Sequence, residues 1–222
     1  MQINKYPRIT TIADGDLFLV ETASDSAYKS IIGSDLKACF AAGSGSSGNT
    51  SISKIFSSAG DANGVFYYLG TALGITAWSN PAGNSRNLLT TTASSTESGN
   101  VNTLSGRVPS EWFTSASANS YVQFYLGGHS LICNHYTLQT RANDADYYPR
   151  NWYFQGSNDG VAWITLDTQT NNLSLNTISQ WADFPITSSV GYRYFRILQF
   201  DNDSSGAPYL CLGQVELYGA FT

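Results

Sequence analysis

Apolar and polar residues alternate along several short segments of the chain. Residues 121–126 place Val122, Phe124 and Leu126 on one side, which is the two-residue period of a half-buried β-strand. No stretch after residue 50 keeps an apolar period of 3.6 residues for three turns. The pattern therefore predicts an all-β fold, an antiparallel sandwich or barrel of many short strands. Further strands are expected at 65–69, 132–140, 152–155, 162–166, 194–200 and 214–218.

The beginning of the chain has a different pattern. Residues 16–21 and 27–32 are strand-like runs joined by the turn-rich segment 22–26, which predicts a β-hairpin. Ser34 then stands where a helix N-cap would, and Gly43 follows the last apolar residue at helical spacing, so one short helix is expected after the hairpin.

Residues 43–50 contain mainly Gly and Ser and have no side chains suited to packing. Such a composition predicts a flexible linker between two parts. A hairpin plus one short helix has too little core to be stable alone. Residues 1–42 are therefore interpreted as an attachment or oligomerisation segment, and residues 51–222 as the folded domain.

The surface carries few charges, because charged residues make up 12% of the 222 positions. The net charge is -5, with 11 Lys and Arg against 16 Asp and Glu and no basic cluster. Binding to the phosphate backbone of a nucleic acid is therefore not expected. No apolar run approaches the roughly 20 residues of a membrane span, and Met1 leads into no signal-peptide h-region, so neither membrane insertion nor export by such a signal is expected.

The three cysteines are Cys39, Cys133 and Cys211. Their number is odd and they have no C-x-x-C spacing, so a disulfide framework is not expected. We interpret all three as small apolar residues, since cysteines outside disulfides are usually buried.

Three segments of the second part resemble one family. They are residues 150–160 with Trp163, residues 192–197, and residues 205–219. In this order they resemble the discoidin-type (coagulation factor 5/8 C-type) domain over about residues 60–219. The resemblance implies a galactose-binding-like jelly roll, a β-sandwich.

The first of these segments can also be read residue by residue. Residues 157–160, Ser-Asn-Asp-Gly, have the chemistry of a turn. Trp152, Phe154 and Trp163 on either side of it are expected to lie in the core rather than to contact a ligand.

The first part of the chain carries a second, shorter resemblance. Residues 9–21, 28–31 and 33–37 look like segments near the start of bacteriophage tail fibres and related virion proteins. In such proteins this segment joins the chain to the tail or to sister chains. The resemblance implies a virion location, with other virion proteins bound through residues 1–42 and a homo-oligomer, for which a trimer is favoured.

The residues give no support for catalysis. His129 is expected in a turn and His135 in a strand, and neither is interpreted as a catalytic base. A glycosidase needs two carboxylates about 5 to 10 Å apart, and most acidic residues of this chain are in turn-like segments. No nucleophile elbow, P-loop or H-E-x-x-H motif is present, so an enzyme is the weaker interpretation.

A cofactor is not expected. The tract Asp201-Asn202-Asp203 offers alternating oxygen atoms of the kind that Ca²⁺ takes, but it lacks the Gly and the distal Glu of an EF-hand loop. A plain turn is the favoured interpretation. Some discoidin-like domains hold a structural Ca²⁺ in a loop, which keeps a calcium site as the alternative.

Ligand binding is the chemistry that the sequence favours. Sugar recognition needs flat aromatic faces beside hydrogen-bonding side chains, and loops at the end of a sandwich are held rigidly by the sheets. Residues 141–150 contain the densest mixture of this kind. The candidate ligand-binding residues in this loop are Arg141, Asn143, Asp144, Asp146, Tyr147, Tyr148 and Arg150. The alternative is a packed loop that covers the end of the barrel.

Two other places are weaker candidates for ligand binding. Trp78 and Arg86 belong to a segment that resembles an early loop of the family. Trp112 and Trp181 are flanked by polar residues and are expected to be partly buried.

Together these observations predict a phage tail fibre or spike adhesin whose discoidin-like head binds a glycan of the host cell surface. The alternative is a structural virion protein, for decoration or baseplate linking, whose jelly roll contacts only other proteins. A third interpretation, an accessory module of a carbohydrate-active enzyme, requires a catalytic domain beside it.

Overall fold

The computed structural model describes residues 17–21, 28–32, 51–143 and 145–222. The chain divides into two compact units, Met1–Asn49 and Thr50–Thr222. In the first unit, strand β1 (Leu17–Glu21) pairs with strand β2 (Tyr28–Ile32) in antiparallel register, as the sequence predicts. The expected helix after Ser34 and the linker at 43–50 lie outside the described residues, as does Cys39.

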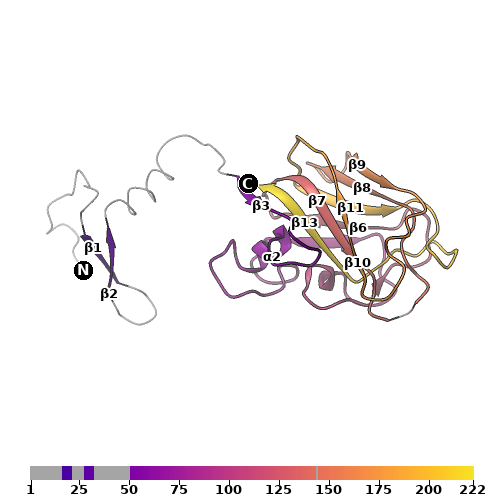
Figure 1. The fold of residues 1–222 in the computed structure, drawn as a ribbon, viewed down its shortest axis with the longest axis horizontal. Helices are drawn as coiled ribbons and strands as arrows, with labels where there is room; N and C mark the ends of the chain where they lie inside the picture. The colour runs from indigo at the N-terminus through magenta and orange to yellow at the C-terminus, as the bar shows by residue number, and fades with distance from the viewer. Residues whose placement is uncertain (1–16, 22–27, 33–50, 144) are drawn as a thin grey trace. The chain divides into compact units, whose positions relative to one another are not determined.

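The second unit is a sandwich of two antiparallel sheets (Figure 1). One sheet has four strands in the order β10-β7-β13-β3, and the other has five in the order β4-β6-β11-β8-β9. The all-β fold predicted from the sequence is therefore confirmed. The strands of the first sheet are β3 (Ile52–Lys54), β7 (Leu131–Gln139), β10 (Trp181–Pro185) and β13 (Gln214–Phe221). Those of the second are β4 (Thr90–Ala93), β6 (Tyr121–Tyr125), β8 (Trp152–Ser157), β9 (Ile164–Gln169) and β11 (Tyr194–Gln199).

Alternating side chains hold the two sheets together. Val122 and Phe124 of β6 are buried, and so are Phe195 and Ile197 of the neighbouring strand β11, while the residues between them are half-buried. Successive side chains of a strand point to opposite faces, so one face of this sheet forms the core. Each apolar side chain buried there contributes about 1.5 to 3 kcal/mol to stability.

One predicted strand is wrong. Residues 65–69 form the helix α2 (Val65–Gly70), in which Val65, Phe66 and Leu69 are buried. These positions follow the spacing of a helix rather than the alternation of a strand. The carboxylate of Glu216 on β13 accepts hydrogen bonds from the backbone N–H groups of Phe66 (2.7 Å) and Tyr67 (3.0 Å). A side chain 150 residues away in the sequence thus accepts hydrogen bonds from two N–H groups in the first turn of this helix, which have no partner within the helix.

The second unit also contains a small two-stranded sheet. Strand β5 (Trp112–Phe113) pairs with strand β12 (Cys211–Leu212), with Trp112 opposite Leu212 and Phe113 opposite Cys211. Trp112 and Leu212 are completely buried in the core. Since neighbouring residues of a strand point to opposite sides, Phe113 and Cys211 share the other side. A 3₁₀ helix, η2 (Val101–Ser105), precedes this sheet.

The tryptophans depart in part from the sequence interpretation. Trp112 is completely buried rather than partly, and its indole N–H donates to the hydroxyl of Thr96 (3.1 Å). Trp152 and Phe154 lie in the core as expected. Trp163 is outside it, half-buried beneath the guanidinium of Arg196, 4.2 Å from the ring centroid.

Further expectations from the sequence concern the cysteines, Trp181 and membrane-spanning helices. Cys133 and Cys211 are buried, as expected, and burial raises the pKa of the Cys133 thiol to about 12. Trp181 is half-buried. In the part of the chain that the structure describes, no helix has the length and apolarity needed to cross a bilayer.

Candidate functional site

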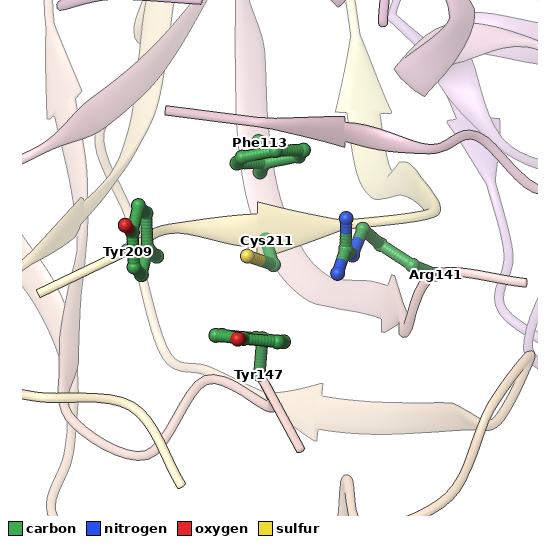
Figure 2. Close-up of a pocket in the computed structure, with 5 residues that line it drawn as sticks. All are labelled: Phe113, Arg141, Tyr147, Tyr209 and Cys211. Atoms are coloured by element: carbon green, nitrogen blue, oxygen red, sulfur yellow. The ribbon is translucent and has the colours of Figure 1, made fainter. Parts of the chain in front are cut away.

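A pocket opens beside the small sheet of β5 and β12. Its volume is about 240 Å³, and Phe113, Arg141, Tyr147, Tyr209 and Cys211 line it. Figure 2 shows Cys211 in the middle, with Phe113 and Tyr147 on opposite sides of it and Tyr209 and Arg141 on the other two. The pocket therefore has three aromatic walls, one guanidinium wall and a thiol at its base.

The walls contact one another at several points. The guanidinium of Arg141 lies 4.8 Å from the ring centroid of Phe113 and 5.6 Å from that of Tyr147. The ring of Tyr209 meets Tyr147 edge-on, with centroids 5.7 Å apart, and meets Phe113 at 6.0 Å. Arg141 is only 6% exposed, whereas Tyr147 is 36% exposed. The arginine is thus a packed part of the wall. Tyr147 is the most exposed of the aromatic walls, since Phe113 and Tyr209 are half-buried.

Backbone hydrogen bonds hold the base of the pocket in place. The N–H of Thr114 donates to the carbonyl of Leu210 (3.1 Å), and the N–H of Leu210 donates to the hydroxyl of Thr114 (3.0 Å). These bonds extend the pairing of β5 and β12 and fix the position of Tyr209. At the other wall, the carbonyl of Arg141 accepts a hydrogen bond from the N–H of Ser179 (2.9 Å).

The loop at 141–150 contributes to the pocket only in part. Tyr148 is buried and has its ring centroid 5.8 Å from the guanidinium of Arg150. Arg150 donates to the carbonyls of Asn172 (2.9 Å) and Leu175 (2.6 Å). Tyr148 and Arg150 therefore stabilise the loop rather than line the pocket.

The polar tip of the same loop is exposed. The side chains of Asn143 and Asp146 face solvent, and the N–H of Asn143 donates to the carboxylate of Glu111 (3.0 Å). Asp144 lies outside the described residues. Of the seven residues predicted in this loop, the structure places Arg141 and Tyr147 in the pocket.

Trp78 and Arg86 lie elsewhere. Trp78 stacks on Tyr67, with ring centroids 6.5 Å apart, and borders a second hollow of about 220 Å³ next to Arg107 and Val108. Arg86 is exposed, and its guanidinium donates to the carbonyl of Gly70 (3.2 Å). The two hollows have no described residue in common.

The remaining candidates of the sequence are also outside the pocket. The ring of His129 packs on Phe221, and His135 stacks on Phe56 with its Nε2 3.1 Å from the carboxylate of Asp183. The carboxylate of Asp203 accepts hydrogen bonds within its own turn, and burial raises the pKa of this group. Among the residues that the structure describes, no three His, Cys, Asp or Glu side chains are grouped as a metal site would require.

The sequence interpretation did not identify Phe113 and Tyr209 as pocket residues. It treated Cys211 as a buried apolar residue and gave it no part in lining a pocket. Phe113 and Cys211 belong to paired segments of only two residues, and Tyr209 lies two positions before Cys211. Such a short pairing has no periodicity from which it could be recognised. The one available signal was the aromatic pair Trp112-Phe113, of which one ring is in the core and the other in the pocket.

The arrangement suits a small, flat, hydroxylated molecule. Aromatic faces offer apolar contact, while the guanidinium and the tyrosine hydroxyls offer hydrogen bonds. The volume is below the roughly 300 Å³ at which drug-sized pockets begin. The described lining contains no carboxylate.

Comparison with known proteins identifies the class to which this architecture belongs. The family model of the F5/8 type C domain matches residues 74–212. The chain is therefore a member of the F5/8 type C domain family, which confirms the resemblance seen in its second part.

Relatives with curated descriptions contain this domain within longer chains. The chain is 28% identical over 174 residues to a BTB/POZ domain-containing protein of Arabidopsis thaliana, covering 73% of this chain and 21% of that protein. It is 31% identical over 169 residues to the E3 ubiquitin-protein ligase Ufd4 of Drosophila melanogaster, covering 72% of this chain and 6% of the ligase. The chain thus spans about a fifth or less of these relatives.

Solved structures share the fold. A CBM32-3 module from a family 31 glycoside hydrolase of Clostridium perfringens aligns with a TM-score of 0.51 and 14% identity, over 60% of this chain and 91% of the module. A CBM32-5 module from the same organism, solved in complex with GalNAc-β-1,3-galactose, aligns with a TM-score of 0.50 and 11% identity, over 59% and 95%. These similarities support the β-sandwich described above.

Proposed function

We propose that the second unit binds a glycan in the pocket between Phe113, Tyr147 and Tyr209, without acting as an enzyme. One observation carries this proposal: three aromatic rings and the guanidinium of Arg141 surround a single cavity of about 240 Å³. A sugar offers both surfaces that such walls require, because its C–H groups pack on aromatic rings and its hydroxyls bond to polar groups. The similar fold of a module solved with GalNAc-β-1,3-galactose supports the same class of ligand.

A single pocket of this size takes little more than one sugar ring, so the affinity of one copy is expected to be low. Joining several copies raises the overall avidity by about 10² to 10⁴ without any new contact. We therefore propose that the chain works as an oligomer, with a trimer favoured.

We propose further that the chain is a phage tail fibre or spike adhesin located in the virion, with a carbohydrate of the host cell surface as its partner. The support is the resemblance of residues 9–21, 28–31 and 33–37 to tail-fibre segments, together with the hairpin of β1 and β2 in that region. Residues 1–42 would then join the chain to other virion proteins.

The second candidate is a structural virion protein whose pocket receives a side chain of another protein. Two curated relatives are named for a BTB/POZ domain and for ubiquitin ligation, so the domain also occurs in proteins that are not named for sugar binding. In that case the exposed ring of Tyr147 is covered by a neighbouring protein and the chain has no affinity for glycans.

A glycan array separates these two candidates. The full chain is expected to bind a subset of glycans, and Tyr147→Ala is expected to abolish this binding because it removes the solvent-facing wall. The matched control is Tyr125→Ala, which removes a half-buried tyrosine stacked on Tyr194 (4.5 Å) outside the pocket. Absence of glycan binding by the wild-type chain, or equal binding by Tyr147→Ala, would contradict the proposal.

A further inference from the structure

The loop that follows β11 holds the backbone on both sides of Tyr147. The hydroxyl of Ser204 donates to the carbonyl of Asp146 and accepts a hydrogen bond from the N–H of Tyr148 (2.9 Å). The N–H of Ser204 donates in turn to the carbonyl of Tyr148 (3.0 Å). One residue thus makes three hydrogen bonds to the two neighbours of Tyr147.

The same loop leads directly to the second tyrosine of the pocket. The N–H of Asp203 donates to the carbonyl of Ala207 (2.8 Å), which closes a tight turn, and the carbonyl of Pro208 accepts from the N–H of Ser117 (3.3 Å). Tyr209 follows immediately. The turn therefore connects Ser204, which bonds to both neighbours of Tyr147, with the wall formed by Tyr209.

We infer that Ser204 is a positioning residue, whose hydroxyl sets the edge-on contact between Tyr147 and Tyr209 that shapes the pocket. This inference rests on the proposed function for its effect on glycan binding. Ser204 lines no part of the pocket, so its influence passes through the backbone on either side of Tyr147. Fixing a wall before the ligand arrives reduces the conformational entropy that binding would otherwise cost.

The first test needs no ligand. Nuclear Overhauser contacts between the rings of Tyr147 and Tyr209 are expected in the full wild-type chain and in Ser204→Thr, which keeps the hydroxyl. They are expected to weaken in Ser204→Ala, where the amide of Tyr148 should also exchange faster with solvent. The control is Ser188→Ala, which removes an exposed hydroxyl bonded only within its own turn, to the carbonyl of Val190 (3.1 Å) and the N–H of Val190 (3.3 Å).

The second test is binding of the same four proteins to an array that includes GalNAc-β-1,3-galactose. Ser204→Ala is expected to bind about tenfold more weakly, with Ser204→Thr and Ser188→Ala at the wild-type level and all thermal midpoints close together. Unchanged ring contacts and unchanged binding in Ser204→Ala would overturn the inference. If the wild-type chain binds no glycan, the proposed function fails, and the ring contacts still decide whether Ser204 positions Tyr147.

Discussion

Glu216 on β13 carries a buried carboxylate, and the residue is only 3% exposed. It accepts hydrogen bonds from the backbone N–H groups of Phe66, Tyr67 and Leu217. Burial raises the pKa of Glu216 to about 7, because removal from water disfavours the charged form more than these donors and Arg107 favour it. This residue joins β13 to α2, so its ionisation bears directly on the stability of the fold.

The raised pKa predicts that stability decreases as the pH rises. An unfolded chain ionises Glu216 near pH 4.5, whereas the folded chain keeps its proton until about pH 7. The folded state is therefore destabilised between these values, by about 3 kcal/mol in total, and the effect is complete above pH 7. Urea unfolding between pH 4.5 and 8 should show this decrease in the wild-type chain relative to Glu216→Gln. If the free energy of unfolding changed with pH in the same way in both proteins, the raised pKa of Glu216 would be contradicted.

At the scale of elements, a close approach joins Thr140, which follows β7, to Gly213, which follows β12. A methyl group on Gly213 would lie 2.3 Å from the carbonyl oxygen of Thr140. Thr140 has little freedom to move, because its N–H donates to the carbonyl of Gln180 (2.9 Å) and its hydroxyl to that of Thr177 (2.6 Å). Gly213 connects β12 to β13, and β12 carries Cys211 of the pocket lining.

Gly213→Ala is therefore expected to destabilise the domain by about 1 to 3 kcal/mol, measured by urea unfolding. The control is Gly191→Ala, where the nearest atom would be the hydroxyl of Ser130 at 3.2 Å, the end of a side chain that can rotate. Equal stability of the two variants would show that the approach at Gly213 has no energetic importance.

The elements also show which parts of the structure a sequence can predict. Alternation identified β6 and β11, because one face of each is buried and the other is not. It failed at α2, because the aromatic residues at 65–69 favour a strand. The side chain that bonds to the first turn of the helix belongs to Glu216, which is 150 positions away in the sequence. It also missed Phe113 and Tyr209, since a pairing of two residues with two others leaves no periodic signal.

At the scale of the whole molecule, the described hydrophobic core belongs entirely to the second unit. Domain stability and assembly are therefore expected to reside in different parts of the chain.

Removing residues 1–49 tests this separation. The remaining chain is expected to unfold cooperatively, with a thermal midpoint close to that of the full chain. Its mass in solution is expected to be that of a monomer, while the full chain is expected to be a trimer. An unfolded or aggregated product would contradict an independent core, and an unchanged oligomeric state would contradict an assembly role for the first segment.

The most direct measurement for the central claim is the mapping of amide chemical shifts in the full chain, titrated with the glycan that binds most strongly on the array. We expect the largest changes at Phe113, Tyr147, Tyr209 and Cys211, which line the aromatic pocket, and no such changes in Tyr147→Ala. Changes centred instead on the hollow next to Trp78, or on the outer face of β6 and β11, would contradict the account.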